Sequence, residues 1–167
     1  MEYRYTHPHD SKLVTMHDCV VTRIDLETTE DGTRMTWYLP DGIWVSPEIA
    51  GDGVQKTCLT DEAYAVFSGK YLRRDDLAVS ICQKSRWHGK DKQLLTETSL
   101  YMKLDEFVEA FRAEGWSLEI VNTYTEDCHF LIEGELRTAK KREGITITFT
   151  ADTANYFWNA IQPDRVW

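Results

Sequence analysis

Alternation of hydrophobic and polar residues with a period of two recurs along most of the chain and predicts a protein built mainly from β-strands. Between residues 14 and 26 the even positions are mostly apolar, whereas the odd positions are mostly polar. Because successive side chains of a strand point to opposite faces, this segment is expected to form one long, half-buried strand. The sequence TTEDGT follows it, and the Asp31–Gly32 step favours a tight hairpin turn.

The segments after this turn predict an antiparallel arrangement. A second turn at 40–42 separates the return strand from a short apolar segment at 43–45, so residues 12–46 are expected to form a three-stranded meander. Residues 46–57 read as a loop, and residues 154–161 fit either a last strand or a short helix. The same alternation predicts further strands at 63–69, 77–83, 93–104, 116–120, 128–132 and 145–149.

One segment has the periodicity of a helix instead. Its apolar residues recur at i, i+3, i+4 and i+7 and are Leu104, Phe107, Val108 and Phe111. We expect a helix at about 104–114, with Asp105 capping its start and Gly115 ending it. Because strands and helices do not alternate, the pattern excludes a parallel α/β sheet. The predicted fold is α+β and mainly antiparallel β: a strongly curved sheet or partly closed barrel with one packed helix.

Length and charge narrow the class of protein further. The chain of 167 residues is expected to form a single domain, 1–167, with residues 1–11 as a loosely held N-terminal arm. Its 28 acidic and 19 basic residues give a formal net charge of −9. Such a chain repels phosphate backbones, so nucleic acid is not expected as a partner, whereas a basic protein or a cationic ligand is compatible with the charge.

The sequence also predicts where the protein resides. No segment approaches the roughly 18 consecutive apolar residues of a membrane span, and the first residues do not resemble a secretory signal. The four cysteines are far apart and form no C-x-x-C pair. We therefore expect a cytoplasmic protein with reduced cysteines and no membrane partner.

A histidine-rich stretch near the N-terminus, THPHDSKLVTMHDC, supplies the candidate metal ligands His7, His9, Asp10 and His17. Neutral imidazoles and carboxylates are suitable ligands for zinc, nickel or iron. The spacing matches no compact metal-binding motif, and histidines on the wet face of a strand need no special explanation. We favour the second interpretation and expect no cofactor.

Asp18 is the candidate catalytic residue, because the alternation places it on the buried face beside Met16 and Val20. Burial without a charged partner favours the protonated carboxyl, as a proton-transferring acid needs. A structural ion pair or a β-bulge at this position would produce the same pattern.

Aromatic residues are numerous and suggest a contact surface. Trp44 is out of phase with its apolar neighbours, and Trp87 lies in a polar hairpin tip. Tyr156, Phe157 and Trp158 are consecutive, so one face cannot bury all of them. Exposed aromatic side chains are favoured at protein interfaces, so these residues form the predicted binding surface.

The sequence therefore favours a non-enzymatic binding protein whose partner is another protein, a basic one for example, or a second copy forming a homo-oligomer. No known catalytic motif is present. One alternative is a barrel-like protein that binds a small apolar ligand oriented by Asp18, Tyr64 or a tryptophan. The other is a metal-dependent hydrolase that uses the N-terminal histidines and aspartate.

Overall fold

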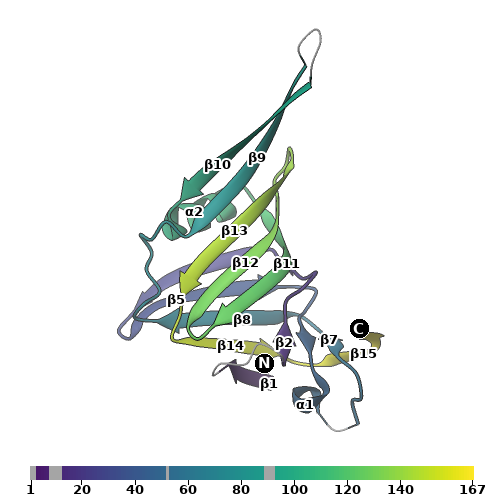
Figure 1. The fold of residues 1–167 in the computed structure, drawn as a ribbon. Helices are drawn as coiled ribbons and strands as arrows, with labels where there is room; N and C mark the ends of the chain where they lie inside the picture. The colour runs from purple at the N-terminus through teal and green to yellow at the C-terminus, as the bar shows by residue number, and fades with distance from the viewer. Residues whose placement is uncertain (1–2, 8–12, 52, 89–92) are drawn as a thin grey trace.

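The computed structural model describes residues 3–7, 13–51, 53–88 and 93–167. The described strands form three sheets, and every strand pairing in them is antiparallel. The protein is α+β and mainly antiparallel β, as the sequence predicts. Its sheets curl around a shared core but do not close into a barrel, and one long helix packs on them (Figure 1).

The first sheet contains five strands and includes the predicted hairpin at Asp31–Gly32. Residues 3–7, part of the predicted arm, form its first edge strand and pair with the segment that was ambiguous between strand and helix. In spatial order the strands are β1 (Tyr3–His7), β14 (Thr153–Trp158), β8 (Ala63–Gly69), β5 (Gly32–Leu39) and β4 (Arg23–Thr29).

The second sheet contains six strands and crosses the first (Figure 1). Its spatial order is β10 (Gln93–Met102), β9 (Val79–His88), β13 (Arg142–Thr150), β12 (His129–Arg137), β11 (Ser117–Glu126) and β3 (Val20–Val21). In their shared register β13 pairs only with residues 79–82 of β9. The β9–β10 hairpin therefore continues beyond β13 and projects from the body.

A small third sheet corrects the predicted meander. Residues 44–45 do not pair with β5, because Gly42, at φ 89°, turns the chain out of the first sheet. They form β6 (Trp44–Val45) between two other strands instead, and the following loop contains a single helical turn, α1 (Pro47–Ala50). The sheet order is β15 (Ile161–Val166), β7 (Cys58–Thr60), β6 and β2 (Val14–Thr15).

The predicted long strand over 14–26 is wrong, because a turn at 16–19 separates β2 from β3, and a break at Thr22 separates β3 from β4. Asp18 adopts a left-handed conformation with φ 59°, and the Cys19 N–H donates a 3.0 Å hydrogen bond to the Met16 carbonyl. The turn changes which positions face inward. Met16 and Cys19 are both buried, whereas Asp18 between them is exposed.

Helix α2 (Leu104–Ala113) confirms the predicted helix and its buried apolar stripe. It begins one residue before Asp105, so that residue is not the N-cap. The backbone N–H of the N-cap residue, Lys103, instead donates to Glu106 Oε2 at 3.2 Å. Gly115, at φ 62°, ends the helix as predicted, and the Trp116 N–H donates to the Phe111 carbonyl at 3.0 Å.

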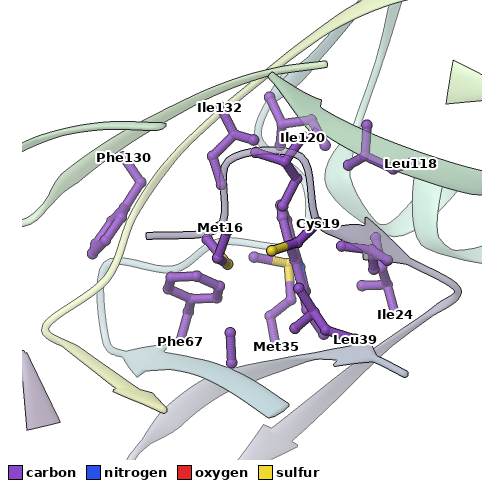
Figure 2. Packing of buried hydrophobic residues seen from close by; sticks show 14 of the residues in the cluster. Met16, Cys19, Ile24, Met35, Leu39, Phe67, Leu118, Ile120, Phe130 and Ile132 are labelled. Atoms are coloured by element: carbon purple, nitrogen blue, oxygen red, sulfur yellow. The ribbon is translucent and has the colours of Figure 1, made fainter. Parts of the chain in front are cut away.

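The core lies between the two large sheets and contains closely packed aromatic rings. The ring of Phe67, from the first sheet, lies edge-on to Phe130 and Phe149, from the second, at centroid distances of 5.1 and 4.9 Å. Phe130 and Phe149 are stacked at 5.2 Å. Figure 2 shows Phe67, Phe130 and Met16 close together within this cluster. Side chains of the described residues thus fill the space between the two large sheets.

Candidate functional site

A groove with a volume of about 650 Å³ lies on the second sheet, at the end where β11 turns into β12 and β13 ends. We call it the β11–β13 groove. It lies at the end of the sheet away from the projecting hairpin tip. The side chains used below to describe it are Asp76, Leu77, Tyr124, Glu126, His129, Leu131, Thr148 and Thr150.

Strand register produces the floor of the groove. Tyr124 of β11 lies opposite Leu131 of β12, and Leu131 lies opposite Thr148 of β13. Directly opposed residues project from the same face of a sheet, so these side chains form one row across three strands. The next row is Glu126, His129 and Thr150.

A β-bulge determines that Tyr124 belongs to this surface. The register of β11 against β12 shifts between Ile120 and Asn122, leaving Val121 as an extra residue. Simple alternation from the buried Ile120 would direct Tyr124 into the core. The extra residue instead directs Thr123 inward and leaves Tyr124 54% exposed.

Leu77 forms an apolar wall beside this floor and is 70% exposed. Its position is fixed by hydrogen bonds on both sides. The Asp76 carbonyl accepts from the N–H groups of Ala78, at 2.8 Å, and Leu104, at 3.1 Å, while the Thr148 N–H donates to the Ala78 carbonyl at 2.7 Å. The loop that carries Leu77 is thereby tied to both helix α2 and strand β13.

The polar side chains of the groove carry carboxylates, hydroxyls and one imidazole. Asp76 and Glu126 contribute carboxylates, and His129 Nδ1 lies 3.0 Å from Thr150 Oγ1. Among the described residues that line the groove there is no lysine or arginine. The arrangement offers apolar contact at its centre and favourable interactions for a cation at its edge.

Two of the aromatic residues predicted for the contact surface are core residues. Tyr156 and Trp158 are buried, because they share the inward parity of strand β14. Burial also raises the pKa of the Tyr156 hydroxyl. Phe157, between them, faces the other way and is half-buried, with the Arg4 guanidinium 5.6 Å from its ring centroid.

Trp44 is half-buried in another aromatic cluster, and it does not line the groove. Its Nε1 donates a 3.0 Å hydrogen bond to the His17 carbonyl. The Trp167 ring lies 5.6 Å from that of Trp44 and 5.4 Å from that of His17. The side chain of Trp87 lies outside the described residues.

Asp18 was a candidate catalytic residue because it was expected to be buried, but the structure places it on the surface. Its side chain is 68% exposed, and Oδ2 lies 3.0 Å from His17 Nδ1. Tyr64, named with Asp18 as a residue that could orient a small ligand, packs edge-on against Tyr38 at 4.8 Å. Neither Asp18 nor Tyr64 lines the groove.

Of the candidate metal ligands, His9 and Asp10 lie outside the described residues, as does the side chain of His7. His17 is described, and its Nδ1 lies 3.0 Å from Oδ2 of Asp18. The described part of the chain contains no group of three or more histidine, cysteine, aspartate or glutamate side chains placed to hold a metal ion.

The buried thiol of Cys19 is not suited to act as a nucleophile. Burial raises the pKa of the Cys19 thiol to about 12, and the carboxylate of Asp18 adds to the effect. The neutral thiol that results is unreactive at neutral pH. Cys82 and Cys128 are half-buried free thiols, and neither lines the groove.

No family model, curated protein or solved structure matches this chain. Neither helix among the described residues is long and apolar enough to cross a membrane. Sequence reasoning did not identify Tyr124, Leu77 and Leu131 as a site, because a bulge and a long-range loop contact bring them together. The sequence gives one signal, Leu131, which is apolar although it lies out of phase with Phe130 and Ile132.

Proposed function

We propose that this chain is a non-enzymatic, cytosolic binding protein whose β11–β13 groove holds an extended segment of a basic protein partner. The observation that carries the proposal is the exposure of Tyr124 and Leu77 on either side of the apolar floor formed by Leu131. Exposed apolar groups in a concave, polar-edged surface are characteristic of interaction sites, and tyrosine is enriched among residues that dominate binding energy.

The shape of the groove favours a protein segment over a small molecule. Small-ligand sites enclose most of their ligand, whereas this groove is open along the surface of the sheet. A chain lying across it could place an apolar side chain between Tyr124 and Leu77 while its flanking residues remain in water. The interior that could have enclosed a small ligand is occupied by the Phe67 cluster.

Charge favours a basic partner. The chain has a formal net charge of −9, and the groove adds the carboxylates of Asp76 and Glu126 at its edge. Complementary charge increases the association rate and disfavours acidic competitors more than it raises affinity. A lysine or arginine beside the apolar residue of the partner would pair with these carboxylates.

The proposal is tested by selecting binders from a displayed library of random peptides, with the folded protein as the target. Peptides enriched on the wild type should combine lysine or arginine with a large apolar residue. Tyr124→Ala should raise the Kd of a selected peptide about 30-fold, the loss of roughly 2 kcal/mol typical of a hot-spot residue. Tyr71→Ala is the matched control, because Tyr71 is 66% exposed but does not line the groove.

Two results would contradict the proposal. One is that no peptide is enriched above the level seen with an unrelated acidic protein. The other is that the enriched peptides bind Tyr124→Ala and Tyr71→Ala equally well. Raising the salt concentration should also slow association while leaving dissociation nearly unchanged, because edge charges act mainly on the encounter.

A further inference from the structure

Strand β10 lies at the edge of the six-stranded sheet, and among the described strands it is hydrogen-bonded to β9 alone. It is ten residues long and pairs with β9 along its whole length. The opposite side of an edge strand presents a row of backbone N–H and C=O groups that can pair with a further strand. This edge is separate from the β11–β13 groove.

The sequence of β10, QLLTETSLYM, lacks the features that normally protect an edge. It contains no lysine, arginine or proline, and Glu97 is its only charged residue. Natural edge strands are usually protected by charges, prolines, bulges or covering segments. The pairing of β10 with β9 also shows no register shift, so no bulge interrupts the strand.

The side chains described along this edge are open to solvent. Leu100 is 45% exposed and Tyr101 is 64% exposed, and residues 97–99 are exposed as well. Because the β9–β10 hairpin continues beyond the end of β13, the strand projects from the body of the molecule (Figure 1). A second molecule could therefore approach this edge along much of its length.

We propose that two copies of the chain associate through β10, which pairs antiparallel with β10 of the second copy and joins the two six-stranded sheets into one. An edge of this kind accepts an extended strand, and a nearly uncharged edge favours a nearly uncharged occupant. The second β10 has both properties and the same length. A basic segment is a less suitable occupant of this edge than of the groove, because Glu97 is the only acidic residue in the sequence of β10.

Symmetry and register support a second copy as the occupant. Antiparallel pairing of identical strands creates a two-fold axis, and such an interface closes after two molecules. With Ser99 on the axis, Glu97 lies opposite Tyr101 and Thr98 lies opposite Leu100. The two copies of Glu97 are then not opposed, so the repulsion between directly opposed like charges is avoided.

Sedimentation velocity over a range of concentrations tests this proposal. The wild type should show a reversible monomer–dimer equilibrium. The double variant Thr98→Lys, Ser99→Lys places four new positive charges at the paired edges of a dimer, with the two copies of residue 99 directly opposed, and should weaken association at least about tenfold. Tyr71→Lys is the control, since Tyr71 is 66% exposed and lies outside β10. Far-ultraviolet circular dichroism would verify that each variant is folded.

A wild type that remains monomeric up to roughly millimolar concentration would overturn the proposal. So would a folded double variant that dimerises as strongly as Tyr71→Lys. Hydrogen exchange on the wild type gives a readout that needs no variant: amides in β10 should become protected as the protein concentration rises, whereas those in β4, the edge of the other large sheet, should not. Concentration-independent exchange in β10 would also reject the interface. None of these outcomes depends on whether the groove binds a basic partner.

Discussion

Two buried side chains, the thiol of Cys19 and the hydroxyl of Tyr156, favour their neutral forms. Burial raises the pKa of Cys19 from 9.0 to about 12 and raises that of Tyr156 above its ordinary value of 10.0. For such groups the fold is stabilised by the neutral form at pH values below the unfolded-state pKa. That contribution is lost as the pH rises above the unfolded-state pKa towards the folded-state value.

The free energy of unfolding should therefore fall as the pH rises above about 9, with Cys19 titrating first and Tyr156 adding to the loss above about 10. Each group contributes up to about 1.4 kcal/mol per pH unit in this window. Tyr156→Phe removes one of them, so its stability should decline less steeply than that of the wild type. Urea unfolding at a series of alkaline pH values measures the slopes. Tyr71→Phe, at an exposed position, should retain the wild-type slope, and equal slopes for all three proteins would contradict this account.

At the scale of elements, the bulge in β11 is the feature on which the groove depends. Gly134 lies opposite Ile120, just before the register shift. A Cβ atom added to Gly134 would collide with the Glu119 carbonyl. The absence of a side chain at this position therefore allows the two backbones to approach where the bulge forms.

Gly134→Ala should destabilise the protein by about 1 to 3 kcal/mol, the usual cost of overpacking, and should weaken peptide binding by disturbing Tyr124. Gly144→Ala is the matched control: it lies on the neighbouring strand, and an added Cβ would be 3.8 Å from the Cys82 Cβ. Thermal unfolding of both variants measures the difference. Equal melting temperatures would show that the bulge does not require glycine opposite it.

The elements that the sequence predicts well are those with uninterrupted periodicity. Helix α2 and the β4–β5 hairpin have clear apolar patterns and glycine-containing ends, so local physics determines them. The turn at 16–19 and the bulge at Val121 each change the parity of a strand. Their sequences differ little from ordinary alternation, which is why Asp18 was expected to be buried and Tyr124 was not recognised as exposed.

The position of the proposed binding surface could not be predicted from the sequence. An exposed aromatic residue near carboxylates is present, as the composition suggested, but it is Tyr124 with Asp76 and Glu126. Tyr156 and Trp158 were expected on the surface because consecutive aromatic residues cannot share one face. Period-two alternation instead buries both of them and leaves Phe157 on the other face.

At the scale of the whole molecule, contacts between the two large sheets hold the fold together. Phe67 is fully buried and contacts rings from both sheets, including Trp37, Phe130 and Phe149. Because these contacts join segments far apart in the sequence, loss of this ring should affect the stability of both sheets together.

Phe67→Ala should lower the free energy of unfolding by about 3 to 5 kcal/mol, as is usual for a buried phenylalanine. Phe157→Ala, at a half-buried position outside this cluster, should cost clearly less. Urea unfolding followed by both tryptophan fluorescence and circular dichroism measures the two effects. Separate transitions by the two probes, or a smaller loss for Phe67→Ala than for Phe157→Ala, would argue against one shared core.

We propose the β11–β13 groove as the surface through which this protein binds a partner. The most direct measurement is a ¹H–¹⁵N nuclear magnetic resonance titration of the wild type with a basic peptide from the library selection. We expect the amides that shift to cluster around Tyr124, His129, Leu131, Thr148 and Leu77. Shifts that concentrate instead around His17, Trp44 and Trp167, or that spread along the surface without saturating, would contradict the account.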